Sequence, residues 1–217
     1  AREAGVKRFV YASSSSVYGD EPNLPKVEER LGNVLSPYAL SKLVNEQYAA
    51  IFARCYGMEC IGMRYFNVFG PRQDPRGAYA AVIPLWFSAM LKDGSIFING
   101  DGETSRDFCF VANVVQANLR AALATRPDAV NRAYNIACGD RTTLNQLVER
   151  IAEAVVKVKP GLQIQPKVAY RDFRAGDVRH SLADISAARD LLGYEPTHQV
   201  GDGLREAAEF YVTSVLA

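Results

Sequence analysis

The sequence has 217 residues, with 25 Lys and Arg against 24 Asp and Glu, a formal net charge of +1 and 48% hydrophobic residues. This balance is typical of a globular protein with a sizeable core, and it excludes intrinsic disorder. No run of five like charges occurs, so we expect no broad surface for nucleic acid or for an anionic membrane. No apolar stretch approaches the ~18 residues of a membrane span, and the start does not resemble a signal peptide. We therefore expect a cytoplasmic protein.

The cysteines and histidines give no sign of a metal centre. The four cysteines form no C-x-x-C pair and the chain has only two histidines, so we expect no metal site. A disulfide framework is unnecessary at this length. We expect buried free thiols at Cys55, Cys60, Cys109 and Cys138.

The first 70 residues predict a βαβ unit. Residues 1–5 are typical of a last helical turn ending in glycine, and residues 8–12 form the continuous apolar run of a strand covered on both faces. From Ser36, which can act as an N-cap, apolar residues recur at helical spacing until Gly57. A second buried strand follows over residues 60–66. The two strands should be parallel with a right-handed crossover, as in half of a doubly wound sheet.

After residue 71, loops rich in Gly, Asp and Arg separate shorter elements. Helical spacing predicts helices near 82–92, 114–125, 144–158, 185–192 and 203–215. Strands are expected near 96–98, 108–111, 133–136 and 163–170. Thr143 and Gln146 form a capping box, and Asp184 and Gly193 bracket the shorter helix. We interpret this part as a smaller α+β lobe built on the sheet.

Tyr38 and Lys42 are four residues apart on the predicted helix, so their side chains share one face. A free tyrosine has a pKa of ~10, and a neighbouring cation favours the phenolate, so such a pair can move protons near neutral pH. The alternative is that Tyr38 packs in the core while Lys42 is a solvated surface residue, because Y-x-x-x-K alone is a weak motif.

Four serines, residues 13–16, follow the first strand. Open α/β sheets place their ligands at the carboxyl ends of such strands. A hydroxyl there can share a hydrogen bond with the oxygen that Tyr38 deprotonates. The alternative is an ordinary polar loop entry, because serine is common in turns.

Five motifs in order give the sequence a resemblance to a known family. They read YASSSSVYGD from residue 11, SPYALSK from 36, RYFNVFGPRQ from 64, GDGETSRDF from 100 and GDVRHS from 176. They resemble the extended short-chain dehydrogenase/reductases that act on nucleotide sugars, and among these the UDP-N-acetylglucosamine 4-epimerases. The resemblance covers essentially the whole chain, and five motifs are far more specific than one. It implies NAD as cofactor and a UDP-sugar as substrate, and it allows for a homodimer of the full-length enzyme.

The resemblance assigns the reacting groups and the cofactor contacts. It implies that Tyr38 is the catalytic base, that Lys42 favours its phenolate and binds the nicotinamide ribose, and that Ser14 is the hydroxyl partner. Ser15 is expected beside the sugar. The implied cofactor-binding residues are Ala12, Ser13, Tyr38, Lys42 and Tyr65.

The resemblance also implies the groups that hold the substrate. Asn67 matches an asparagine that contacts the nucleotide sugar, and Ala81 and Val82 match a backbone segment lying on the uridine diphosphate. The expected walls of the uracil pocket are Trp86, Phe97 and Asn99.

The remaining substrate contacts are polar. Arg106 and Arg174 match two arginines that grip the diphosphate, and two guanidinium groups suit a diphosphate on a chain without general positive charge. Asp177 matches a carboxylate on the uridine ribose, and Ser181 the position beside C2 of the sugar. The alternative for each arginine is an exposed surface residue, and for Ser181 a loop serine that satisfies local backbone.

One family feature is absent, because no G-x-x-G-x-x-G turn occurs in the chain. We therefore expect the carboxyl-terminal part of a longer enzyme that lacks roughly 100 or more residues, and a fragment that is inactive alone. In this interpretation residues 1–70 are the remaining second half of a Rossmann-type NAD-binding domain. Residues 71–217 are mainly the nucleotide-sugar lobe, with some segments returning to the sheet. The predicted fold is α/β with a partial doubly wound parallel sheet.

The expected reaction is reversible C4 inversion of a UDP-N-acetylhexosamine through a 4-keto intermediate. A dehydratase or decarboxylase of the same family is the first alternative, although those enzymes place an acidic residue where this chain has Ser15 and Ser16. A non-catalytic fragment that binds a nucleotide sugar is the second alternative. NAD retained on purification separates an enzyme from such a binding module.

Overall fold

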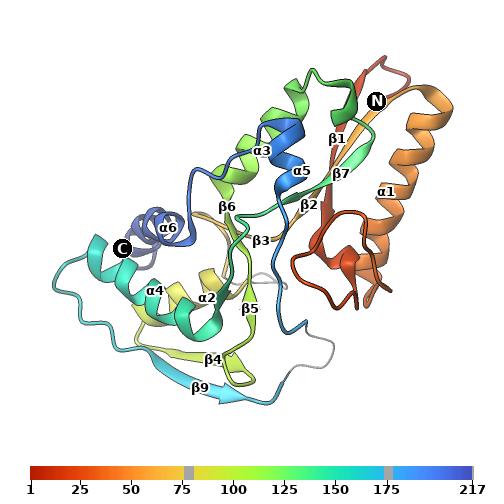
Figure 1. Cartoon of the computed structure of the whole chain (residues 1–217). Helices are drawn as coiled ribbons and strands as arrows, with labels where there is room; N and C mark the ends of the chain where they lie inside the picture. Colours follow the sequence, from red (N-terminus) through yellow and green to blue (C-terminus); the bar gives the residue numbers. More distant parts are fainter. Residues whose placement is uncertain (76–80, 174–177, 217) are drawn as a thin grey trace.

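The computed structural model describes residues 1–75, 81–173 and 178–216. A parallel sheet with the order β1-β2-β7 supports the first part of the chain. Its strands are β1 (Arg8–Ser14), β2 (Glu59–Tyr65) and β7 (Arg132–Ile136). Helix α1 (Pro37–Tyr56) lies on one side of this sheet, and α3 (Val111–Leu123) and α5 (Ser186–Leu192) lie on the other (Figure 1). The predicted α/β fold with parallel strands is therefore confirmed.

Local capping sets the ends of α1, as the sequence predicts. The side chain of Ser36 accepts a hydrogen bond from the backbone N–H of Ala39, and Gly57 ends the helix in the left-handed conformation at φ +65°. The first strand runs further than expected, through Ser14. It leads directly into the 3-10 helix η1 (Ser15–Tyr18), so the serines belong to regular structure and the polar-loop interpretation was wrong.

Among the described residues, the lobe away from the sheet of β1, β2 and β7 contains three helices and three small sheets. The helices are α2 (Val82–Leu91), α4 (Leu144–Val158) and α6 (Val200–Leu216). The parallel strand pairs are β3 (Asn67–Phe69) with β6 (Phe108–Phe110), and β4 (Ser95–Asn99) with β9 (Lys167–Arg171). The antiparallel pair is β5 (Ser105–Arg106) with β8 (Thr142–Thr143), and a short 3-10 helix η2 (Pro127–Ala129) precedes β7. The predicted capping box of Thr143 and Gln146 is present at the start of α4.

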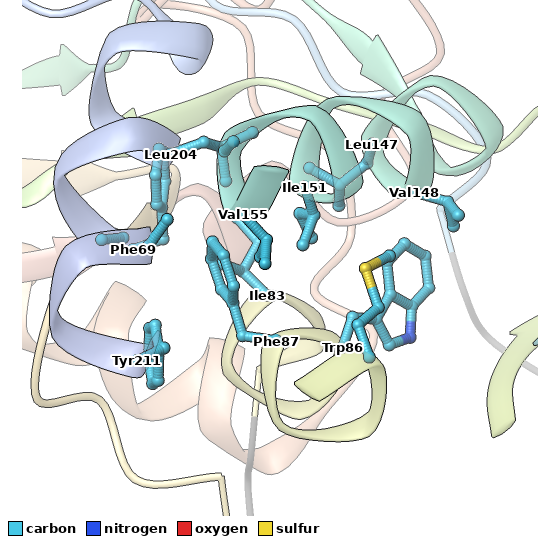
Figure 2. Close-up of a cluster of buried hydrophobic side chains, with 14 of the residues drawn as sticks. Phe69, Ile83, Trp86, Phe87, Leu147, Val148, Ile151, Val155, Leu204 and Tyr211 are labelled. Carbon is cyan, nitrogen blue, oxygen red and sulfur yellow. The ribbon is translucent and has the colours of Figure 1, made fainter. Parts of the chain in front are cut away.

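Two large hydrophobic clusters hold most of these elements together, and a third, of Ala49, Met58 and Cys60 with Tyr11 and Phe52 against it, joins α1 to the sheet. The largest one joins α2, α4 and α6 over the lobe strands, and Figure 2 shows its central side chains, with Phe87 between Ile83 and Tyr211. The second one lies between the sheet and the helices α3 and α5, and includes Ile61 and Ile136. Residues 111–136 and 183–194 thus return to the sheet after the chain has entered the lobe. The division at residue 70 remains an interpretation.

Several expectations differ from the structure. Residues 1–5 form hydrogen-bonded turns and no helix, and the last predicted strand begins only at Lys167. Helices α3 and α6 both start three residues earlier than predicted. Cys55 is exposed, because it lies on an outward face of α1, whereas the other three thiols are buried as expected. In the described part of the chain no helix is both long and apolar enough to cross a membrane.

Candidate active site

Tyr38 and Lys42 lie on the first two turns of α1, beside the carboxyl end of β1. The ammonium nitrogen of Lys42 lies 5.6 Å from the centre of the Tyr38 ring and donates a hydrogen bond of 3.1 Å to the carbonyl of Ala12. Tyr38 is 57% exposed, which contradicts the alternative in which this ring packs in the core. The pair therefore presents an accessible phenol with a cation next to it.

The end of β1 together with η1, residues 13–18, is called the serine turn, and it brings hydroxyl groups to the same edge of the sheet. Ser13 is buried and donates its hydroxyl hydrogen bond to Glu46 of α1. Ser14 caps η1, since its Oγ accepts from the backbone N–H of Ser16 at 3.2 Å. Ser15 faces a cavity that opens beyond the strand end. Ser13, Ser14 and Ser15 thus have different environments, although the sequence shows only a run of four identical residues.

The cavity has a volume of about 240 Å³ and is lined by residues from segments far apart in the sequence. Four residues of the expected substrate set lie on its walls: Ser15, Asn67, Arg106 and Ser181. The first turn of α1 reaches it through Ser36 and Ala39. The carboxyl ends of parallel strands are the usual ligand position in open α/β sheets.

Backbone contacts fix two of these wall residues. The Asn67 backbone N–H donates to the carbonyl of Asp107 at 3.2 Å, and its side-chain amide donates to the same oxygen at 3.3 Å. Arg106 donates to the carbonyls of Ser105 and Arg179, at 3.0 and 3.2 Å. These bonds orient both side chains independently of any ligand.

A buried carboxyl group joins the segments that form the cavity walls. Asp107 accepts backbone hydrogen bonds from Cys138 at 2.9 Å, Gly139 at 3.1 Å and Ala183 at 3.2 Å. Burial raises the pKa of Asp107 to about 7, against the opposing effect of the three N–H donors. Asp107 therefore ties the strand before α3 to the loop after β7 and to the segment that carries Ser181.

Among the cavity residues outside the predicted set, two have basic side chains, His180 and Lys26. A hydrogen bond of 2.9 Å joins Nδ1 of His180 to Oγ of Ser105. Burial and the nearby arginines lower the pKa of His180. It stands inside the GDVRHS motif beside Ser181, so the motif itself was the available signal. The Lys26 side chain is buried, and its ammonium group forms an ion pair with Glu21. The surrounding loop has no sequence motif that predicts this pair.

Other members of the expected set lie away from this cavity. Ala81 and Val82 begin α2, and Trp86 is 4% exposed in the core of the lobe (Figure 2). Phe97 and Asn99 lie on the outward face of β4, where the Arg171 guanidinium stands 3.5 Å from the centre of the Phe97 ring. The structure does not bring Trp86 and Phe97 to one surface. Their assignment to a uracil pocket remains a prediction.

The expected set has three further residues, Tyr65, Arg174 and Asp177. Tyr65 ends β2, and its hydroxyl donates to Asn118 Oδ1 at 2.9 Å, so that hydroxyl is engaged inside the protein. Arg174 and Asp177 lie outside the described residues. Within the described ranges the structure contains no group of His, Cys, Asp and Glu side chains that could hold a metal ion.

The fold and the site together define a class of protein. The parallel sheet, the serine turn and the Tyr-x-x-x-Lys helix meet near one cavity, although Ser14, Tyr38 and Lys42 are not among the residues of its wall. Such an arrangement suits proton transfer on a ligand hydroxyl. Residues 1–137 match the NAD dependent epimerase/dehydratase family. The chain therefore belongs to that family.

Individual relatives agree with this membership. The chain is 36% identical over 212 residues to a UDP-glucose 4-epimerase of Mycolicibacterium smegmatis, covering 97% of this chain and 64% of the relative. Among solved structures, it resembles a UDP-N-acetylglucosamine 4-epimerase of Methanobrevibacter ruminantium in complex with UDP-N-acetylmuramic acid, with a TM-score of 0.87, 38% identity and coverages of 98% and 65%. A UDP-glucose 4-epimerase of Thermotoga maritima with UDP-glucose gives a TM-score of 0.88, 36% identity and coverages of 98% and 66%. The chain thus spans about two thirds of the length of these relatives.

Proposed function

We propose that this chain carries the proton-transfer and substrate-binding groups of an NAD-dependent UDP-sugar 4-epimerase. The observation that carries the proposal is the cavity of Ser15, Asn67, Arg106 and Ser181 beside the helix turn of Tyr38. Relatives named as 4-epimerases of UDP-glucose and of UDP-N-acetylglucosamine support the reaction class.

The residues at the strand ends fit the nicotinamide ribose of NAD. The Tyr38 hydroxyl belongs to an exposed ring, and the Lys42 ammonium lies between that ring and the carbonyl of Ala12, where it can donate to a ribose hydroxyl. Bound NAD supplies a hydride acceptor and donor at C4 of the sugar.

In the proposed reaction this chain binds, orients and moves a proton. Tyr38 removes the proton of the 4-hydroxyl and returns one after the 4-keto sugar has turned over, with Lys42 stabilising the phenolate and Ser14 sharing the hydrogen bond. Arg106 meets the diphosphate by charge-assisted hydrogen bonds. Because the pyrophosphate anchors the sugar at one end, the ring can rotate without leaving the site.

We further propose a UDP-N-acetylhexosamine as substrate. Ser181 is a small residue on the cavity wall, and a small side chain there leaves room for an acetamide group. The dehydratase alternative has less support, because Ser15 and Ser16 supply no additional acid or base beside the sugar.

The test is an epimerase assay on the protein as its gene encodes it, with UDP-N-acetylglucosamine, UDP-glucose and UDP-glucuronic acid followed by NMR of the products. We expect bound NAD after purification and a higher kcat/KM on the acetamido sugar. Ser181→Tyr should lose that activity selectively by ten- to a hundred-fold, since overpacking costs ~1–3 kcal/mol. Ser214→Tyr, at an exposed position of α6, is the matched control. No turnover of any of the three sugars would contradict the proposed reaction, and equal losses on all sugars would make Ser181 structural.

A further inference from the structure

Helix α1 faces the sheet with small and charged side chains rather than with a broad apolar stripe. Of its 20 residues only Ala39 and Ala49 are buried. Between them, Lys42 donates to the Ala12 carbonyl and Glu46 accepts from the Ser13 hydroxyl, at successive positions of β1. Alanines allow close approach but interlock little with a neighbouring surface. One small apolar cluster, in which Ala49 and Phe52 pack with Tyr11, Met58 and Cys60, holds the second half of the helix. In the first half, polar contacts fix where the helix sits along and around its axis.

Arg64 of β2 supplies the most directional of these contacts. Its Nε donates to Oε1 of Glu46 at 2.9 Å and its Nη2 to Oε2 at 2.8 Å, which is a two-pronged pairing of guanidinium and carboxylate. Arg64 is 4% exposed, so solvent screens the pair little. A rigid planar fork of this kind fixes both position and orientation.

The same guanidinium also reaches the serine turn. Its Nη1 donates to the Tyr18 hydroxyl at 3.1 Å and to the Glu28 carbonyl at 2.8 Å. Tyr18 is the last residue of η1, the 3-10 helix that begins directly after Ser14. One buried arginine therefore links the helix that carries the phenol to the turn that carries the hydroxyls.

We infer that Glu46 and Arg64 are positioning residues that set Tyr38 and Lys42 against the serine turn. This inference rests on the proposed function of the site. Tyr38 is exposed, so its own packing does not locate it, and Glu46 lies two helical turns further on, ~12 Å along the axis. Neither positioning residue lies on the cavity wall.

The chain offers a matched pair for comparison at the other end of the same two strands. Two nitrogens of Arg8, the first residue of β1, contact Glu59, the first residue of β2, at 2.6 and 3.0 Å. This pair has the same chemistry, but its side chains are 21% and 43% exposed, against 5% and 12% for Arg64 and Glu46. Among the described residues, Glu59 makes no hydrogen bond to α1 or to the serine turn. Glu59→Gln is therefore the control for Glu46→Gln.

The first test compares steady-state kinetics of these two variants in the protein as its gene encodes it. Glu46→Gln should lower kcat about tenfold or more and change KM less than about threefold, because small misplacements of reacting groups are costly while the binding cavity is untouched. Glu59→Gln should leave both constants unchanged. Parental kcat in Glu46→Gln, or equal losses in the two variants, would overturn the inference.

A second variant separates positioning from stability. In Glu46→Leu/Arg64→Met both charges are replaced by apolar side chains of similar volume, and buried pairs replaced in this way often keep or gain stability. We expect a moderately lower Tm, because the Ser13 hydroxyl and the Glu28 carbonyl lose their partners, in a protein that still folds while kcat stays low. A double variant that folds and has parental kcat would show that the pair does not position the helix.

The two proposals can fail separately. If the parent turns over no UDP-sugar, the proposed function fails, and amide hydrogen exchange across residues 37–46 then decides the inference without any substrate. Faster exchange in Glu46→Gln than in Glu59→Gln supports positioning by Glu46. The same exchange in both variants contradicts it.

Discussion

Helices α1 and α4 are attached to the molecule in opposite ways. Helix α4 has 15 residues and buries five of them, Leu147, Val148, Ile151, Ala154 and Val155, in the core of the lobe. Helix α1 is longer but buries only two alanines. Extensive apolar packing therefore determines the place of α4, whereas α1 has one small apolar cluster around Ala49 and Phe52 and relies on directed polar bonds in its first half.

This difference agrees with the structural role of α4 in the core and with the role that we propose for α1 in the active site. A buried stripe such as that of α4 tolerates no gap, because core side chains are close-packed. The face of α1 that meets the sheet end must leave an accessible phenol and ammonium, so it cannot be closed by large apolar side chains. Substitutions in α4 should consequently change stability, and those near the start of α1 should change activity.

The largest effect is expected at Tyr38. Tyr38→Phe removes the hydroxyl that we propose transfers the proton, and should lower kcat by ~10²–10⁴-fold with little change in Tm, because the ring is exposed. Tyr48→Phe, at another exposed tyrosine of α1, is the control and should retain full activity. Turnover of Tyr38→Phe close to that of the parent would remove Tyr38 from the mechanism.

The second prediction tests the apolar attachment of α4. Ile151→Ala should lower the free energy of unfolding by ~2–5 kcal/mol, because Ile151 is fully buried and its loss leaves a cavity. Ile51→Ala on α1 removes the same atoms at a site that is 42% exposed, and should cost less than about 1 kcal/mol. Urea unfolding of both variants measures the contrast. Equal costs would mean that α1 is packed as firmly as α4.

The third prediction concerns Asp107, which lies between the two regions. Its pKa is raised from an ordinary value near 3.8 to about 7, so between these values the folded protein holds a proton that the unfolded chain has lost. The free energy of unfolding should therefore fall as pH rises from about 4 to about 7, through this group, and level off above. Asp107→Asn should lose ~1–3 kcal/mol at low pH through poorer hydrogen bonding and should lack this slope. Identical pH slopes in parent and variant would exclude Asp107 as the titrating group.

The smallest effects are expected at the two helix caps. Thr143→Ala removes one half of the capping box of α4, and Ser36→Ala removes the side-chain cap of α1, each at a cost of ~1 kcal/mol in stability. Only Ser36→Ala should also lower kcat, because Tyr38 lies in the turn that Ser36 holds. Thermal unfolding and kinetics on both variants check this, and a drop in kcat for Thr143→Ala alone would reverse the comparison.

The sequence predicts elements well where the signals are local. Ser36 and Gly57 mark the two ends of α1, and the capping box of Thr143 marks the start of α4. These signals are accurate to the residue, since capping depends on neighbours within one turn. Strands β3, β5 and β8 have two or three residues and exist through pairing with distant segments. No periodicity can show in so short a stretch, so they were not predicted.

The site divides in the same way. Motif spacing suggests Tyr38 with Lys42, and the resemblance adds wall residues that the fold brings together. The sequence does not predict the pairing of Glu46 with Arg64. One residue lies on a helix and the other in a buried strand, and no sequence pattern connects two such positions. Lys26 is similar: only the folded loop shows that its ammonium is enclosed.

The strand order has a consequence for how the chain folds. Strands β2 and β7 are hydrogen-bonded neighbours, yet the whole stretch from residue 66 to residue 131 separates them in sequence. The entropic cost of closing a loop rises with its length, and contacts between distant segments form slowly. The connection between β1 and β2, residues 15–58, is shorter, so we expect this pair to form somewhat more readily than the pair of β2 and β7. Because Ser181 lies on the cavity wall, a nascent chain can complete that wall only after the segment with Ser181 has been synthesised.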